Sequence, residues 1–476
     1  MTHGALSRLL GLLALTSAFV PEIRAQNAGD EVRVSSRPVP GTEPGARAVR
    51  ALHQEHWAQA LELAELAYER RPDEARSHSL LGECAWRAGF LQRAEDLFQH
   101  GVGLNPRHGR NHSGLARALM SQGFDEAAAQ STRLAVQLSP TDATTWLAHA
   151  AALARIGQRD QAIDALDQGR TLMIASGRRS VLEVARVRQA VNALDFGAAH
   201  SVQLDADQRR GRLPLRIEAG MPIVDVPFRS KDGGSVVVPM LVDTGGALTL
   251  ILDDAVAETV DHERTGRRTI IGFHDRPVAD SGRVRSMTLG EWRFEDVPAV
   301  YVPLEPDVDS ADRTLPYAGI LGPGFAHERV WVLNFRRKSM AVQGSDDRGE
   351  DEASEGELRV PFRLLGDGKV VLSLMIGCEP VLALVDSGAR QSRRSRRLAE
   401  ESIWGPLQFR ATDLEDTVMR FPPPPVQPML DDRVSPNLGV EISLLLGFDF
   451  LHRFGIVTLD YPHRTLTLTP RDERRR

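Results

Sequence analysis

Leu241-Val242-Asp243-Thr244-Gly245-Gly246 is a segment that recurs in near copy as Leu384-Val385-Asp386-Ser387-Gly388-Ala389. In both segments an aliphatic run precedes an acid, a hydroxyl residue and a glycine, which predicts a strand that delivers the acid to a tight turn. The glycine lets the backbone pass close to the acid, where a side chain would clash. Downstream of each copy, two aliphatic residues and a glycine end at Gly322 and at Gly447. One acid in each half, in matching surroundings, predicts two halves that bring two carboxylates together.

The tripeptide of acid, hydroxyl residue and glycine is common in turns and is a weak signal by itself. Asp280-Ser281-Gly282 has the same order, but Pro277-Val278-Ala279 before it is not a clean hydrophobic strand, so we interpret it as a turn. The specific signal is therefore the ordered pair of full units, each with its own downstream motif ending in glycine.

With these residues the C-terminal half, from about residue 213 to about residue 470, resembles the retropepsin-like and pepsin-like aspartic proteases. The resemblance implies an all-β, bilobal domain with both lobes on one chain, as in pepsins. It implies that Asp243 and Asp386 are the catalytic pair. It implies that the hydroxyls of Thr244 and Ser387 lock the two loops together. It implies that the backbone amides of Gly245 and Gly388 donate to the carboxylates. Gly322 and Gly447 would support the site as the glycines of the downstream motifs.

Two carboxylates held close together cannot both ionise cheaply, so one keeps a proton and the pair titrates as a unit. The charged partner draws a proton from a water between them, and the protonated partner donates to the oxygen of the scissile carbonyl. The sequence does not assign acid and base between Asp243 and Asp386. This chemistry needs neither a cofactor nor a metal ion, and no Cys/His cluster with metal-ligand spacing occurs in the sequence.

Pepsins place Ser or Thr directly after the glycine of each active-site loop, where the hydroxyl can stabilise the carboxylate. This chain has Gly246 and Ala389 at those positions. Without that donor the pKa values of the pair should be higher. We therefore predict a pH optimum milder than that of a pepsin.

The sequence also departs from the family. The segment from Arg390 to Arg397 holds five arginines where the family has an apolar strand, so it should be solvated, re-routed or paired. The region 272–282, in the place of the first flap hairpin, lacks a glycine-rich tip, and Phe421-Pro422-Pro423-Pro424-Pro425 interrupts the second. These departures put substrate closure in doubt.

A period of 34 residues precedes the two lobes, and it is kept by Pro38, Pro72, Pro106 and Pro140, and by Gly89, Gly123 and Gly157. The period resembles the tetratricopeptide repeat, which implies an all-α solenoid of stacked helix pairs with a concave docking face. We expect three clear units between about Glu74 and about Met173, a degenerate unit from about Gly41, and a capping helix at about 180–194. A scaffold that only rigidifies the protein is the alternative to a docking surface.

The N-terminus resembles a secretory signal, because Arg8 precedes an apolar run that ends at Val20 and is too short to cross a bilayer. Cleavage after Ala25 would export the protein to the periplasm or the extracellular space. Two cysteines, Cys84 and Cys378, exclude a disulfide framework. A net charge of −6 gives no reason to expect a nucleic-acid partner.

The sequence thus predicts a multidomain protein, with an all-α tetratricopeptide solenoid followed by an all-β bilobal domain like that of aspartic proteases. The expected divisions are a signal peptide (1–25), a flexible lead-in (26–44), the repeats with their cap (45–195), a linker (196–212), the first lobe (213–343), an acidic linker (344–357), the second lobe (358–470) and a charged tail (471–476).

The resemblance implies an exported aspartic endopeptidase that cleaves a peptide or protein substrate, with repeats that dock the substrate or a protein partner, and with no integral membrane segment after signal cleavage. Two alternatives remain open at this stage. One is a non-catalytic binding scaffold with a degenerate protease-like domain, which the arginine run and the weak flaps favour. The other is a homodimer in which two first lobes pair and the second lobes are structural.

Overall fold

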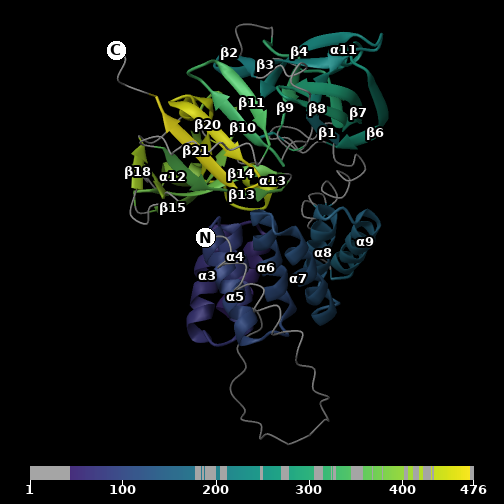
Figure 1. Cartoon of the computed structure of the whole chain (residues 1–476). Coiled ribbons are helices and arrows are strands. Elements are labelled where there is room, and N and C mark those ends of the chain that lie inside the picture. Colours follow the sequence, from purple (N-terminus) through teal and green to yellow (C-terminus); the bar gives the residue numbers. More distant parts are fainter. Residues whose placement is uncertain are drawn as a thin grey trace, which may run out of the picture.

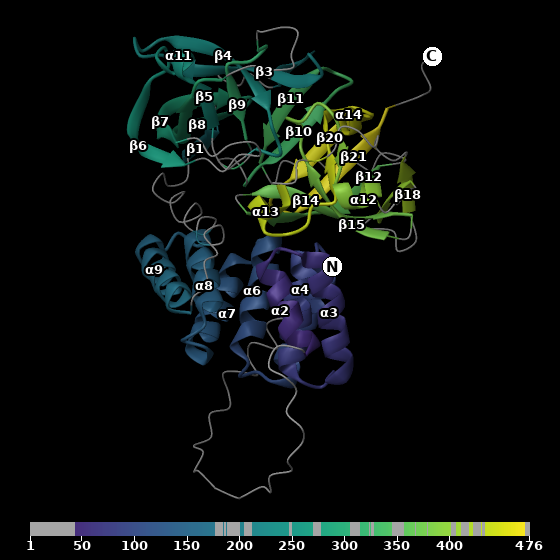
Figure 2. The ribbon, with the colours of Figure 1, turned by 180° about the vertical axis from the view of Figure 1, so that it is seen from behind.

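The protein consists of a helical N-terminal part and a strand-rich C-terminal part, which Figure 1 shows one below the other and Figure 2 shows from behind. The signal peptide, the lead-in, the capping helix and the acidic linker fall wholly or almost wholly outside the described residues. This computed structural model describes residues 43–176, 184, 187, 200–203, 212–246, 250–269, 278–304, 315–322, 324, 328–344, 357–366, 368–377, 379–400, 406–410, 418–421, 430 and 434–471.

Helices in the N-terminal part follow one another as antiparallel pairs, so the degenerate first unit is a full helix pair like the others. We call these pairs the repeat domain. Its helices are α2 (Pro44–His53), α3 (Trp57–Arg70), α4 (Ala75–Arg87), α5 (Leu91–Leu104), α6 (Gly109–Gln122), α7 (Asp125–Leu138), α8 (Ala143–Arg155) and α9 (Arg159–Ala175).

The 34-residue period sets where these helices turn. Gly89, Gly123 and Gly157 lie between the two helices of a pair with φ of 87°, 87° and 76°, a left-handed conformation that glycine adopts without strain. Small residues let the helices approach one another. Phe98 of α5 lies against Gly82 of α4 and Gly114 of α6, where an added Cβ would collide with the ring. The period therefore encodes both the turns and the close packing.

The first lobe begins at residue 213, and a short strand, β1 (His200–Gln203), pairs with it from outside that boundary. Its elements are β2 (Leu213–Glu218), β3 (Met221–Arg229), β4 (Ser235–Val242), β5 (Leu250–Asp253), α11 (Asp254–Ala257), β6 (His262–Thr269), β7 (Val278–Leu289), β8 (Trp292–Val302), β9 (Gly319–Leu321), β10 (Val330–Asn334) and β11 (Ser339–Gln343).

The second lobe repeats this plan with shorter strands. Its elements are β12 (Leu358–Pro361), β13 (Arg363–Leu365), β14 (Lys369–Ile376), β15 (Glu379–Val385), β16 (Arg393–Arg394), α12 (Arg396–Glu400), β17 (Leu407–Arg410), β18 (Val418–Phe421), α13 (Val434–Leu438), β19 (Leu444–Leu446), α14 (Phe448–Leu451), β20 (Phe454–Asp460) and β21 (Thr465–Pro470).

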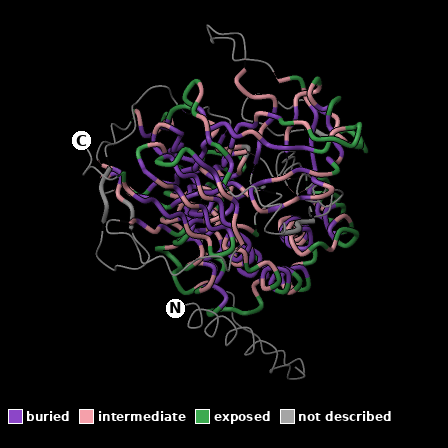
Figure 3. The backbone as a smooth tube through the Cα atoms, turned by 45° about the horizontal axis from the view of Figure 1, so that its top comes forward, coloured by how far each residue is buried: buried purple, intermediate pink, exposed green. Residues whose placement is uncertain are grey.

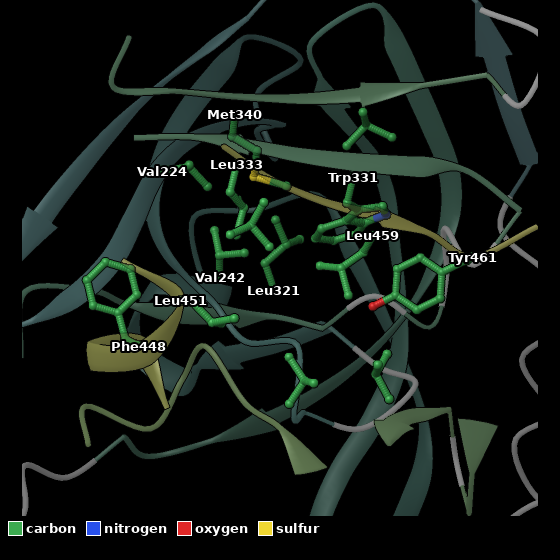
Figure 4. Packing of buried hydrophobic residues seen from close by; sticks show 14 of the residues in the cluster. Val224, Val242, Leu321, Trp331, Leu333, Met340, Phe448, Leu451, Leu459 and Tyr461 are labelled. Atoms are coloured by element: carbon green, nitrogen blue, oxygen red, sulfur yellow. The ribbon is translucent and has the colours of Figure 1, made fainter. Parts of the chain in front are cut away.

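The two lobes share a sheet, which the sequence pattern does not predict. The strand order β12-β21-β20-β10-β11-β2 places β20 of the second lobe beside β10 of the first, with Val332 opposite Thr458. Buried side chains from both lobes form one cluster, and Figure 4 shows Leu333 and Leu459 of this sheet near Val242 of the first active-site strand. Figure 3 shows the buried backbone concentrated in the middle of the strand-rich part. The lobes are thus held by a common core.

Two interpretations of the sequence are corrected by the structure. The expected linker 196–212 contains β1, which adds to β8. Asp280-Ser281-Gly282 is not a turn but part of strand β7. Gly282 is required there because an added Cβ would collide with the carbonyl oxygen of Glu263, beside the bulge in β6. The hydroxyl and glycine of this tripeptide therefore serve strand packing.

Arginines of the run 390–397 form structure instead of a solvated loop. Arg393 and Arg394 make strand β16, antiparallel to β19, and the Arg394 side chain is fully buried. Arg397 donates to the carboxylates of Glu441 and Glu379 at 2.7 and 3.4 Å. Re-routing is thus excluded for this segment, since β16 takes the place of the apolar strand of the family.

The repeat domain packs on the second lobe through the turn edge of its helices. Trp86 and Leu91 of the α4–α5 turn join Leu382, Leu384 and Leu445 in one buried cluster. These three leucines belong to β15 and β19, the strands that end directly before Asp386 and Gly447. The helical part is therefore docked on its own chain beside the candidate site.

Polar groups close the same interface. Arg363 of β13 donates to Glu95 at 2.6 Å and to Gln92 at 2.9 Å, and both of these residues lie on α5. The backbone amide of Glu441 donates to the carbonyl oxygen of Arg87 at 2.7 Å. The Arg363 and Glu95 side chains are only 14% and 15% exposed, so the pair is nearly desolvated.

We expect Arg363→Ala to lower the free energy of unfolding by about 2 kcal/mol, because it leaves the Glu95 carboxylate nearly buried without that partner. Chemical denaturation would measure the loss, and hydrogen exchange in α5 and β13 should rise. Arg93→Ala is the matched control, since Arg93 pairs with Glu65 at an exposed site and should cost below about 1 kcal/mol. Equal losses for the two variants would show that the Arg363 pair does not hold the interface.

Candidate active site

Two equivalent loops, one at the end of β4 and one at the end of β15, carry the acids. In each lobe the downstream aliphatic-aliphatic-glycine motif forms a strand parallel to the acid-bearing strand, with Leu241 opposite Ile320 and Leu384 opposite Leu445. The amide of Asp243 donates to the Leu321 carbonyl at 3.1 Å, and that of Asp386 donates to the Leu446 carbonyl at 3.0 Å. The downstream motif therefore fixes the backbone at which each acid leaves its strand.

The glycines of the two loops lie against the opposite acids. A Cβ added at Gly388 would lie 2.6 Å from Cγ of Asp243, and one added at Gly245 would collide with Cγ of Asp386. Only glycine fits at either position, because any side chain would occupy the place of the other lobe's carboxyl group. The structure thus brings Asp243 and Asp386 together into a pair, which we call the dyad.

Four hydrogen bonds lock the loops across the pseudo-twofold axis, and we call this set the hydroxyl lock. Thr244 N donates to Ser387 Oγ and Ser387 N donates to Thr244 Oγ1, both at 3.0 Å. Ser387 Oγ donates to the Val242 carbonyl at 2.6 Å, and Thr244 Oγ1 donates to the Val385 carbonyl at 3.2 Å. Both hydroxyl residues are fully buried. Each buried hydroxyl thus both accepts from an amide and donates to a carbonyl of the opposite lobe, which holds the loops in one register.

Backbone donors reach the two carboxylates unequally. Gly245 N donates to Oδ1 of Asp243 at 2.9 Å. Oδ1 of Asp386 accepts from both Gly388 N and Ala389 N, each at 3.0 Å. Since hydrogen bonds to a carboxylate favour its charged form, the environment favours a negative charge on Asp386 more than on Asp243.

Burial raises the pKa of Asp243 well above its ordinary value, and the neighbouring Asp386 carboxyl raises it further. Burial also raises the pKa of Asp386, against which its hydrogen bonds with Asp243, Ala389 and Gly388 act. The positive charge of Lys369 opposes the rise in the pKa of both acids. The dyad therefore keeps a proton at pH values where an isolated carboxyl would have lost it.

The two downstream glycines lie beside this arrangement. Gly322 is buried directly after β9, and Gly447 directly after β19. A Cβ at Gly447 would lie 2.6 Å from the backbone carbon of Gln391. Gly447 N donates to Ser392 Oγ, which donates in turn to Asp449, and the sequence pattern gave no indication of this Ser392–Asp449 pair.

Within the described parts of the chain, no group of three or more His, Cys, Asp or Glu side chains is placed to hold a metal ion. In that same part of the chain, no helix has the length and apolarity needed to cross a bilayer. The first flap tip, at 270–277, lies outside the described residues, while β18 ends at Phe421 directly before the prolines.

Comparison with known proteins agrees with this geometry. Residues 226–325 match a family model described as aspartyl protease. The strand-rich part of the chain is aspartic-protease-like. The match covers part of the first lobe and ends before the second lobe. The second lobe is assigned to the same fold because it repeats the plan of the first. No match is found among the curated proteins.

Two solved structures illustrate the likeness of the helical part. A thermophilic tetratricopeptide repeat protein of Thermus thermophilus is 21% identical over 32% of this chain and 81% of its own, with a TM-score of 0.28. The TPR2B domain of yeast Sti1, solved in a complex with pHsp70, is 18% identical over 25% of this chain and 96% of its own, with a TM-score of 0.23.

Proposed function

We propose that this protein is an aspartic endopeptidase in which Asp243 and Asp386 together activate a water molecule for attack on a peptide bond. The observation that supports it most is the reciprocal packing of each acid against the glycine of the other loop, under the hydroxyl lock. In this arrangement both acids come from one chain, which supports the single-chain pair over a homodimer of first lobes.

The proposed reaction consumes one water molecule and uses the one proton that the dyad shares. The charged carboxylate takes a proton from water as the water oxygen bonds to the scissile carbonyl carbon, and the protonated carboxyl gives its proton to the carbonyl oxygen. The resulting tetrahedral diol then loses its C–N bond. The protonated carboxyl gives its proton to the amine nitrogen, while one diol hydroxyl gives its proton to the charged carboxylate and becomes the carbonyl oxygen of the new acid. The products are an acid and an amine, and the dyad again holds one proton.

Pepstatin-sensitive cleavage tests this proposal. We expect the purified protein to cut an unfolded protein substrate at internal bonds, and pepstatin, which mimics the tetrahedral intermediate, to suppress the cleavage. Mass spectrometry of the fragments in H₂¹⁸O should show one ¹⁸O incorporated at each new carboxyl end. If the protein binds pepstatin but cleaves no member of a peptide library, it is the non-catalytic scaffold. The observation that favours this alternative is the buried Arg394 of strand β16, beside the second loop.

We propose that the repeat domain docks a protein or peptide partner through a face other than its turn edge. Support comes from the packing described above, because the α4–α5 turn is already covered by the second lobe. A partner that displaced this edge would uncover β15 and β19, which flank the second active-site loop. Export through residues 1–25 remains a prediction, and fractionation of cells producing the full chain would test it.

We expect the pH–rate profile to peak at a milder pH than that of a pepsin. The active form carries one proton on the dyad, and burial raises the pKa of both acids, so the acidic limb of the profile should lie at higher pH. At Gly246 no hydroxyl is present to oppose this. Measuring kcat/KM from strong acid to neutral pH would check it, and a maximum in strong acid would contradict it.

A further inference from the structure

Lys369 begins β14, the strand that pairs with the Asp386-bearing strand β15, and its charge acts on both acids of the dyad. Strands β14 and β15 are antiparallel, with Val371 opposite Leu384, and continuing this register by two residues places Lys369 opposite Asp386. Residues at opposite positions of neighbouring strands point to the same face of the sheet. Lys369 is only 7% exposed, so its charge is held in a nearly desolvated environment. A cation is thus built into the strand beside one acid of the dyad.

The first lobe has a methionine at the equivalent position. Ile223 is opposite Leu241 in the β3–β4 pair, and the same two-residue continuation places Met221 opposite Asp243. Met221 is buried and packs with Ile223 and Leu241 in an apolar cluster. The two half-sites are therefore symmetric in backbone and unequal in charge, since one acid has a thioether across from it and the other an ammonium.

Tyr461 is a further titratable group that interacts with the dyad. The Tyr461 hydroxyl is fully buried on the β20–β21 turn, near enough for the charge on Asp243 to raise the pKa of Tyr461 further, after burial as the main cause. Asp460, the last residue of β20, accepts from the backbone amide of His463. The backbone donors add to the inequality, with two on Asp386 and one on Asp243.

We propose that Lys369 is a positioning residue that holds Asp386 as the carboxylate and leaves the shared proton on Asp243. The proposal rests on the proposed function, in which the two acids take opposite roles. It assigns them: Asp386 takes the proton of the attacking water, and Asp243 protonates the carbonyl oxygen. A nearby ammonium favours the charged form of a carboxylate, and its effect is strong where water is excluded.

Lys369→Met makes the second half-site match the first and is the principal test. Removing the cation should shift both limbs of the pH–rate profile to higher pH by about one unit or more, since the ammonium stabilises every anionic form of the dyad. Lys369→Arg keeps the charge and should restore the wild-type limbs. Lys231→Met is the matched control, because Lys231 is an exposed lysine that pairs with Glu258.

A titration without substrate separates this inference from the proposed function. Carbon-13 labelling of the aspartate carboxyls would follow the dyad by NMR in the folded protein. We expect the dyad signals to titrate at higher pH in Lys369→Met than in the wild type, whether or not any peptide is cleaved. An unchanged titration in Lys369→Met would overturn the inference, even if that variant were less stable or less active.

The dyad variants give a second arm that leaves Lys369 in place. In Asp243→Asn the remaining acid is Asp386, and in Asp386→Asn it is Asp243. We expect Asp386 alone to titrate at lower pH than Asp243 alone, because Asp386 accepts from two backbone amides and Asp243 from one, and because the continued register places Lys369 opposite Asp386. The reverse order would overturn the assignment of acid and base, including in the case that Lys369→Met does not fold.

Discussion

Replacing either dyad acid by Asn is expected to reduce peptide hydrolysis by a factor of about 10³ or more, because one position then no longer exchanges protons with water or substrate. Asparagine keeps the shape of the side chain, so the packing of Asp243 against Gly388 and of Asp386 against Gly245 should survive. Steady-state kcat/KM on a pepstatin-sensitive substrate would measure the loss.

Asp280→Asn is the matched control for these variants. Asp280 begins the same tripeptide of acid, hydroxyl residue and glycine, yet it lies in β7 and pairs with Arg264 and Arg267 at a partly exposed site. We expect kcat/KM within about twofold of the wild type, since a surface ion pair contributes below about 1 kcal/mol. Full activity in Asp243→Asn or Asp386→Asn would exclude the proposed dyad chemistry.

The dyad should also make the free energy of unfolding depend on pH. Because burial raises the pKa of both acids in the fold, the native state binds protons more tightly than the unfolded state. The stabilisation that comes from the dyad is therefore fully present below the pKa of an unfolded aspartate, about 4, and is lost as pH rises through the pKa values of the folded state. Asp386→Asn or Asp243→Asn removes one titrating group, so the loss as pH rises from the unfolded pKa towards neutrality should be smaller than in the wild type. Urea denaturation at a series of pH values would show it, and equal slopes would contradict it.

The repeated local patterns were sufficient to predict that Asp243 and Asp386 lie together, and to predict the helices. A hydrophobic run before Asp243 and another before Asp386 predicted two strands ending in acids, and the pairing of β4 with β9 and of β15 with β19 explains why a second motif follows each. In the helical part, the 34-residue period placed Gly89 and its equivalents in the turns. Such features are encoded within a few residues of one another.

Features that depend on partners far along the chain were missed. Strand β10 reads as the end of the first lobe, and only its pairing with β20 reveals the shared sheet. The run that contains Arg394 was expected to be solvated, re-routed or paired, and no local pattern shows that β16 lies beside β19. Lys369 is one of three lysines in the sequence. Counting residues on both sides of the turn between β14 and β15 could have indicated that Lys369 lies near Asp386. Register between distant segments is the information that the local pattern lacks.

Thr244→Val is expected to lower the free energy of unfolding by about 2 to 4 kcal/mol, the second large effect, because two buried polar groups lose their partners. Valine matches threonine in volume but has no hydroxyl, so Ser387 N loses its acceptor and the Val385 carbonyl loses a donor. A buried polar group left without a partner costs about 1 to 3 kcal/mol. Urea denaturation would measure the loss. We also expect kcat/KM to fall at least about tenfold, because the lock sets the distance between the two carboxyls.

A double-mutant cycle separates the lock from simple loss of two hydroxyls. Ser387→Ala removes the other half, and because the hydroxyls act on each other's loops, the double variant should lose less stability than the sum of the single variants. Thr259→Val is the control: its hydroxyl donates to the Val256 carbonyl at 2.8 Å on the exposed surface, and the variant should stay within about 0.5 kcal/mol of the wild type. Additive losses, together with an unchanged carboxyl titration in Thr244→Val, would mean that the shared sheet and core position the dyad without the lock.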